Sequence, residues 1–216
     1  MQNEIESELD KIEHYQKFPL MKPFIGENYY DSTKKILFIG ESHYFDMAEK
    51  DITKDYINSS PSKWYESSQE VLHESKHNWI NTRRVVSTST HMVFTELEKV
   101  LSNSMEKYKN REINNIAFMN GFQRPANKYG ASIKYMVGER DYEEGKKTIE
   151  AVVEIIKPDY VIFISKFTWE NIGTKVTRIP HIKYEFINHP ASIKYWHDEN
   201  NPHSKYRLIE LLNNVN

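Results

Sequence analysis

Four short apolar runs, separated by stretches with helical spacing, constrain the fold of this chain more than any other feature. The runs cover residues 34–40 (KKILFIG), 113–120 (INNIAFMN), 160–164 (YVIFI) and 181–188 (HIKYEFIN). Such runs are typical of strands that are buried on both faces of a parallel sheet. Helical spacing of apolar residues is found over residues 4–16, 93–101, 149–156, 167–172 and 204–215. The alternation predicts an α/β fold, a three-layer α/β/α sandwich around a central, mostly parallel, four-stranded sheet.

The composition narrows the class of protein further. The chain has 216 residues, a formal net charge of −2 and no cysteine. The length predicts one domain over residues 1–216, and we expect a monomer. Without cysteine there are no disulfides, iron–sulfur clusters or Cys-based zinc sites, and we expect no cofactor. The polar, acidic start is unlike a signal peptide and no apolar stretch reaches membrane-spanning length, so we expect a cytoplasmic protein without a membrane partner.

Polar, turn-forming segments follow three of the four predicted strands. They are residues 40–44 (GESHY), 120–125 (NGFQRP) and 188–192 (NHPAS). Open parallel sheets bind ligands beyond the carboxyl ends of their strands. The sequence therefore predicts that these three segments meet in one binding site.

Taken in order, these motifs resemble those of the uracil-DNA glycosylase superfamily. GESHY is similar to the catalytic turn of that family, NGFQRPAN to the second-strand Asn and the Arg-Pro that follows it, and NHPAS to the fourth-strand His-Pro-Ser loop. The stretch IIKPDYVIFISKFTWENIG is similar to the third strand and its helix in the bacterial branch. With the segments between them, these motifs span residues 34–196. The resemblance implies an enzyme that flips a base out of DNA and cleaves its N-glycosidic bond.

The resemblance also implies roles for individual residues. Asn120 would read the O4 and N3–H edge of uracil, because a carboxamide offers one acceptor and one donor. His189 would donate a hydrogen bond to O2 as negative charge develops on the departing base. The implied catalytic residues are Glu41, His43 and His189; the implied base-binding residues are Gly40, Ser42, Tyr44, Asn120 and Phe122; the implied nucleic-acid contacts are Arg124, Ser192, Ile193 and Lys194. The implied partner is single- or double-stranded DNA, or a free nucleobase or nucleotide.

The turn after the first strand departs from the family pattern. Ser42 stands where the best-known branch has a catalytic Asp, and His43 stands where a Pro is usual. A hydroxyl cannot supply the negative charge of a carboxylate, which leaves Glu41 or His43 as the catalytic group. The alternative is a non-catalytic protein of the same fold that binds a base or a nucleic-acid end. Glu41 and Ser42 can also be helix caps, and Arg124 a surface charge.

One competing motif lies elsewhere in the chain. Residues 73–77 (HESKH) match H-E-x-x-H, which on a helix places two imidazoles to bind zinc and a Glu to act as general base. A charged Lys76 inside the motif and the polar sequence after it are unlike a buried metalloprotease helix. A zinc hydrolase that uses His73, Glu74 and His77 is thus a further alternative.

Overall fold

The centre of the computed structural model is one five-stranded sheet. The structure describes residues 2–44, 61–66, 80–88, 91–104, 112–126 and 132–213. The strand order is β1-β4-β2-β6-β7, and β2 at the centre runs parallel to both of its neighbours. The strands are β1 Phe24–Ile25, β2 Ile36–Gly40, β4 Ala117–Asn120, β6 Tyr160–Phe163 and β7 Lys183–Phe186. The four predicted strands are confirmed as a parallel set, each shorter than its apolar run.

Two features of the strands were not predicted. β1 joins the edge of the sheet antiparallel to β4, with Phe24 opposite Phe118. β3 (His43–Tyr44) pairs in parallel with β5 (Pro125–Ala126) to form a second, two-stranded sheet. Each of these strands has only two residues, and a two-residue strand has no alternation that a sequence pattern could reveal.

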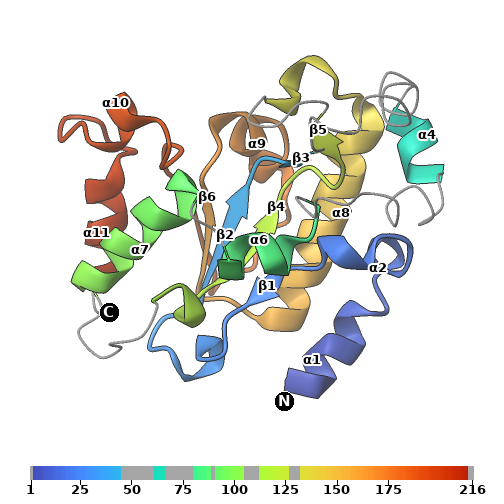
Figure 1. Cartoon of the computed structure of the whole chain (residues 1–216), viewed down its shortest axis with the longest axis horizontal. Helices are drawn as coiled ribbons and strands as arrows, with labels where there is room; N and C mark the ends of the chain where they lie inside the picture. Colours follow the sequence, from blue (N-terminus) through green and yellow to red (C-terminus); the bar gives the residue numbers. More distant parts are fainter. Residues whose placement is uncertain are drawn as a thin grey trace.

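Helices cover both faces of the central sheet, which gives the predicted three layers (Figure 1). Successive side chains of a strand point to opposite faces. Along β2, Leu37 and Ile39 therefore pack in one core and Ile36 and Phe38 in the other. The first core includes residues of α8 (Glu139–Ile156), α1 (Gln2–Leu9), α2 (Glu13–Lys17) and α4 (Pro61–Glu66). The second includes residues of α7 (Met92–Ser104), α6 (Thr82–Thr88), α10 (Ile193–Trp196) and α11 (Lys205–Asn213).

The remaining helices are short. They are α9 (Lys166–Asn171) and the 3₁₀ segments η1 Pro19–Met21, η2 Tyr29–Asp31, η3 Glu112–Asn115, η4 Ile133–Tyr135 and η5 Gly173–Lys175. No helix in the described ranges combines the length and the apolar character that crossing a membrane requires.

The helix predicted over residues 4–16 is interrupted in the structure. α1 ends at Leu9 and α2 begins at Glu13. Between them the Ile12 N–H bonds to the Leu9 carbonyl, only three residues back, at 3.2 Å. This tight turn redirects the chain, so that Leu9 and Tyr15 are both fully buried. Spacing alone did not reveal the break, because apolar residues continue through it.

Candidate functional site

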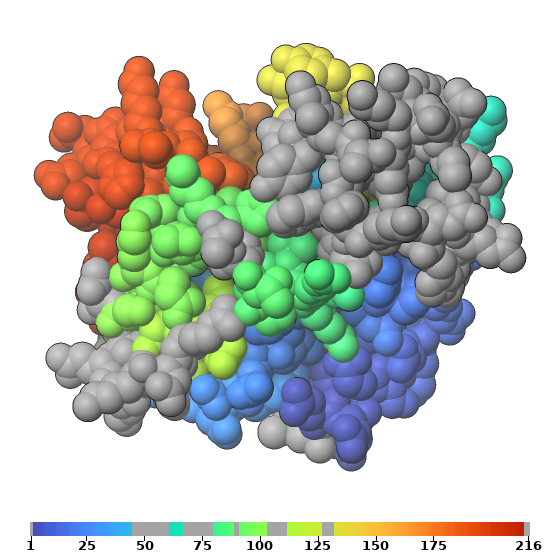
Figure 2. Space-filling view, viewed as in Figure 1, coloured from blue at the N-terminus to red at the C-terminus, as the bar shows by residue number. Residues whose placement is uncertain are grey.

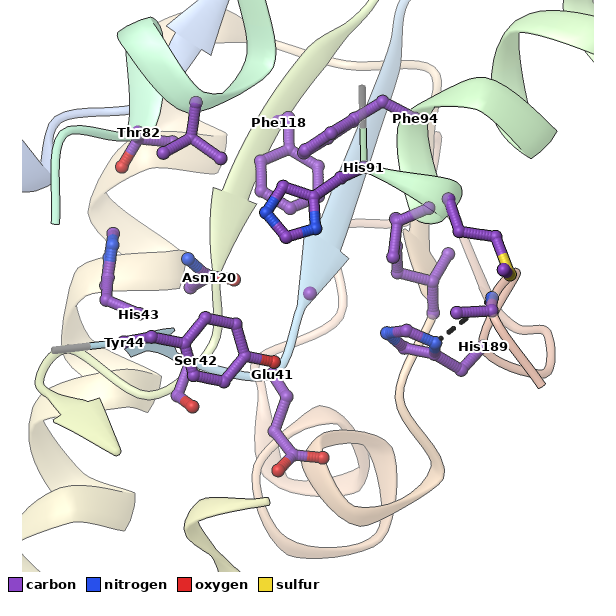
Figure 3. Close-up of a pocket in the computed structure, with 16 residues that line it drawn as sticks. Glu41, Ser42, His43, Tyr44, Thr82, His91, Phe94, Phe118, Asn120 and His189 are labelled. Carbon is purple, nitrogen blue, oxygen red and sulfur yellow. Dashed lines mark hydrogen bonds between the residues drawn. The ribbon is translucent and has the colours of Figure 1, made fainter. Parts of the chain in front are cut away.

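A cavity of about 230 Å³ lies at the carboxyl ends of the parallel strands, where the sequence predicts a site. All three predicted segments contribute to its wall: residues 40–44, Asn120, and the loop that holds His189 and Ala191 (Figure 3). The rest of the wall comes from Phe118 and Ile164 of the sheet region, Thr82 and Val85 of α6, and residues 91–94 at the start of α7. Met92 and Ala191 are exposed, so the cavity margin reaches solvent there. The predicted convergence of the three segments is present in the structure.

Gly40 makes room for this cavity at the end of β2. It pairs with Asn120 across the parallel β2–β4 ladder. A Cβ added at Gly40 would lie 2.6 Å from Asn120 Oδ1 and 2.9 Å from Phe118 Cζ, closer than real Cβ atoms come. Only glycine therefore leaves both side chains free to line the cavity in these positions.

Asn120 and His189 reach the cavity from opposite ends of its polar wall. Asn120 is the last residue of β4, and its carbonyl accepts a hydrogen bond from Gln123 Nε2 at 2.5 Å, which tightens the turn that follows. The carboxamide of Asn120 lies on the cavity side of this turn (Figure 3). The amide and the imidazole thus face one space.

His189 is held as a neutral hydrogen-bond donor. Its Nδ1 accepts the Ala191 backbone N–H at 3.2 Å, which leaves the proton of a neutral ring on Nε2. Burial lowers the pKa of His189 below its ordinary value, and the nearby Glu41 carboxylate opposes this only in part. Figure 3 shows the other edge of the ring directed into the cavity. The Nε2–H is consequently available to a carbonyl oxygen of a ligand.

Glu41 points its carboxylate away from the space between Asn120 and His189 (Figure 3). Its Oε1 accepts the Ile133 N–H at 3.0 Å, and its Oε2 accepts the Ser165 hydroxyl at 2.9 Å. Glu41 thereby ties η4 and the loop after β6 to the turn after β2. In this arrangement the carboxylate supports the rim of the site.

Ser42 and His43 are almost fully buried. Figure 3 shows the Ser42 hydroxyl turned away from the cavity centre. Burial lowers the pKa of His43 to about 3, so the ring is neutral at ordinary pH. Neither side chain is placed as a charged group facing a ligand.

Phe122 and Arg124 do not line the cavity. Phe122 is fully buried and stacks on Phe167, with ring centroids 5.3 Å apart. Arg124 is 3% exposed, and its Nε donates to Asp141 Oδ1 of α8 at 2.6 Å. This corrects the expectations that Phe122 contacts the base and that Arg124 contacts nucleic acid or is a surface charge. Both residues instead anchor the turn after β4 to the helical layer.

The loop that carries the remaining predicted nucleic-acid contacts is accessible. Ser192 is half-buried, Lys194 is exposed and Ile193 is 60% exposed. Trp196 at the end of α10 donates from Nε1 to Glu96 of α7 at 3.2 Å, which fixes this loop against α7. The segment from His189 to Trp196 is therefore placed beside the cavity by a buried anchor and keeps its apolar and cationic side chains in solvent.

Sequence reasoning missed the wall contributed by α6 and α7. Figure 2 shows these two helices side by side at the centre of one face, in green. His91, which directly precedes α7, projects into the cavity region together with Phe94 (Figure 3). No motif marks these residues, and the only available signal was their position at the start of a predicted helix. Their proximity to Asn120 arises from packing between layers.

Fold and cavity together define the class: an α/β protein with a cavity at the carboxyl edge of a mostly parallel sheet. No family model matches the sequence, and a search of curated proteins likewise gave no match. In the described part of the chain, no group of three or more His, Asp or Glu side chains is placed to hold a metal ion. His73, Glu74 and His77 lie outside the described residues.

Proposed function

We propose that this protein is a uracil-DNA glycosylase-like enzyme that binds uracil or a related damaged base in this cavity and hydrolyses its N-glycosidic bond. The observation that supports the proposal best is the convergence of Asn120 and His189 on one cavity at the carboxyl edge of the sheet. A carboxamide and a neutral imidazole donor match the edge of uracil that carries O4, N3–H and O2.

The remaining wall suits a flat ring. Phe118, Phe94 and Tyr44 line the cavity beside these two polar groups. Binding is favoured when a heterocycle replaces water against aromatic and aliphatic walls, and the few polar groups fix the orientation of the heterocycle. The exposed Ile193 and Lys194 next to the cavity would contact the strand from which the base is extruded.

In the proposed reaction the bond between sugar C1′ and base N1 breaks, and its electron pair goes to the base. His189 Nε2–H donates to O2 of the base as negative charge develops there. Water then adds to C1′, and its proton leaves to solvent. A preorganised donor of this kind is worth about 10²–10³ in rate.

A second candidate, binding without cleavage, is favoured by the position of Glu41. Its carboxylate accepts two hydrogen bonds and points away from the cavity centre, and Ser42 supplies no charge. The protein would then hold a base, a nucleotide or a nucleic-acid end without breaking the glycosidic bond.

The experiment that tests the proposal uses a uracil-containing oligonucleotide, single- and double-stranded. Alkali-revealed strand cleavage reports base release, and a gel shift reports binding. We expect release by the wild type and a loss of about 10²–10³ in rate for Asn120→Ala and for His189→Ala. The exposed His181→Ala is the matched control and should leave the rate unchanged.

The other outcomes are equally specific. Binding that depends on Asn120 without any release would establish the non-catalytic candidate. If the protein neither binds nor releases uracil, both candidate functions are refuted. Bound zinc in elemental analysis that is lost in His73→Ala would point instead to a zinc hydrolase.

Glu41→Gln separates a supporting role from a catalytic one. The glutamine oxygen can still accept the Ile133 N–H, and the amide nitrogen can reach the Ser165 oxygen. The rim should therefore keep its shape. If Glu41 acts only as a support, the rate of base release should fall less than about tenfold, the cost of one net hydrogen bond. A loss of about 10² or more with unchanged thermal stability would show that the negative charge itself takes part in catalysis.

A further inference from the structure

A second hollow, which the proposed function does not use, lies between α8 and the two N-terminal helices. This groove has a volume of about 380 Å³, and its described lining shares no residue with the cavity at the carboxyl ends of the strands. One face of α8, the end of α1 with the turn after it, and the start of α2 form its wall (Figure 1). The turn that interrupts the helix predicted over residues 4–16 therefore shapes a groove on the surface.

The described lining of this groove carries more carboxylates than ammonium groups. Its cations are Lys11 and Lys147, and each is already paired with a carboxylate of the same groove. Lys11 Nζ lies 2.5 Å from Glu8 Oε1. Lys147 Nζ lies 3.1 Å from Glu13 Oε2. Further carboxylates in the lining are consequently not neutralised by these lysines.

Two such carboxylates, Glu144 and Glu154, lie on α8. Neither forms an ion pair with another residue of the described ranges. They are separated by ten residues of helix, or about 15 Å along its axis, so one metal ion or one ammonium group cannot contact both. The lining beside them is apolar and consists of Ile12, Ala151 and Ile155. The free charges are thus far apart, with aliphatic surface next to them.

His14 adds a buried polar side chain to the same lining. It is 6% exposed, and Nε2 is closed to solvent and has no hydrogen-bond partner in the part of the chain that the structure describes. A ligand in the groove can therefore reach the ring only through Nδ1. Burial lowers the pKa of His14 to about 3, so at neutral pH the ring is uncharged and Nδ1 can accept a hydrogen bond. The neighbouring Glu13–Lys147 pair places this part of α2 beside the stretch of α8 between Glu144 and Glu154.

From the two separated carboxylates, the aliphatic surface beside them and the partnerless His14 ring, we infer that this groove binds a linear polyamine such as spermine. Alkyl amines are protonated at neutral pH, as lysine is. An extended chain advances about 3.5 Å per three bonds, so the terminal nitrogens of spermine are about 15 Å apart. The terminal ammonium groups donate to Glu144 and Glu154, and the methylene groups cover Ile12 and Ala151. An inner ammonium group donates to Nδ1 of His14.

The test is isothermal titration calorimetry of the full chain with spermine and with the short diamine putrescine, at constant ionic strength and neutral pH. We expect saturable binding of one spermine per chain. The double variant Glu144→Gln/Glu154→Gln should lower the affinity for spermine about tenfold, because each exposed ammonium–carboxylate pair contributes up to about fivefold. Glu139→Gln/Glu143→Gln is the matched control: it removes two exposed charges from α8 outside the groove and should change the affinity less than about twofold. Putrescine reaches only one of the two carboxylates and should bind more weakly by a similar factor.

The position of the ligand is tested separately by NMR of histidine-labelled protein. Spermine should shift the imidazole resonances of His14 and leave those of the exposed His181 in place. An unshifted His14 would overturn the inference. So would the absence of saturable binding, an equal loss of affinity in the control variant, or putrescine that binds as tightly as spermine. None of these measurements involves base release, so the inference and the proposed function are tested independently.

Discussion

Asp141→Asn is expected to lower the free energy of unfolding by about 3–5 kcal/mol, because it leaves the buried Arg124 guanidinium without its counter-charge. The side chains of Asp141 and Arg124 are 0% and 4% exposed. A charge that stays in the interior after its partner is removed keeps the full cost of desolvation. The cost of breaking this pair therefore far exceeds that of breaking an ion pair on the surface.

The carboxylate of Asp141 also organises the groups around it. It accepts Arg124 Nε at 2.6 Å and Nη2 at 3.0 Å, the Tyr65 hydroxyl at 2.9 Å, and the Gly138 N–H at 2.9 Å. Arg124 donates in addition to the Met136 carbonyl. The turn after β4, the start of α8 and α4 are thus joined at one buried point, and Asn120 sits at the beginning of that turn. We therefore expect Asp141→Asn to lower the rate of base release as well as the free energy of unfolding.

Urea unfolding at neutral pH measures the effect. Glu8→Gln is the matched control, because it removes one partner of the exposed Lys11–Glu8 pair, whose side chains are 66% and 50% exposed. That change should cost less than about 1 kcal/mol. A loss for Asp141→Asn as small as the loss for Glu8→Gln would contradict the account of a buried, mutually dependent pair.

Lowering the pH below about 6.5 is expected to destabilise the protein steeply, because His14 and His43 are buried as neutral rings. Burial is the main cause that lowers the pKa of each to about 3. Charges on His43, Lys17 and Lys147 lower the pKa of His14 further, and Glu13 raises it in part. A backbone hydrogen bond with Ile80 raises the pKa of His43 in part. Nε2 of each ring has no hydrogen-bond partner within the described ranges, so a proton there would be unsolvated.

The direction of the effect follows from where protons bind. Between about pH 3 and pH 6.5 the unfolded chain takes up protons on these histidines and the folded chain does not. Stability is therefore fully present above pH 6.5 and is lost as the pH falls towards 3. The loss is about 1.4 kcal/mol per pH unit for each histidine, or about 5.6 kcal/mol for both over two units.

The free energy of unfolding in urea, measured from pH 7 to pH 5, gives this slope. His14→Gln and His43→Gln should each remove about half of it, since glutamine does not titrate. His181→Gln, at an exposed position, should leave the slope unchanged. A stability that stays flat over this range would show that the two rings are not buried as neutral groups.

The strands β2, β4 and β6 of the parallel sheet were predictable because burial on both faces favours apolar residues at nearly every position. The pattern of β2, in which all five residues are buried, shows this directly. The same reasoning placed Gly40, Asn120 and His189 together, because carboxyl ends of parallel strands meet at one edge. These predictions depend only on local composition and on the handedness of parallel connections.

Other features depended on contacts between distant segments. β1 is only two residues long, and its pairing with β4 is a long-range contact without a local pattern. Arg124 looks like a surface charge in the sequence, and only the packing of α8 against the turn brings Asp141 to it. His91 lacks any motif and enters the cavity because α7 covers that face of the sheet.

By itself, the sequence determined the layered α/β architecture, the order in which the strands alternate with helices, and the edge of the sheet at which polar turns gather. The tertiary structure decided which polar side chains face the cavity and which support its rim, as with Glu41 and Arg124. The reason is physical: a backbone pattern is set by residues a few positions apart. The direction and charge state of a side chain are set by whatever packs against it from elsewhere in the chain.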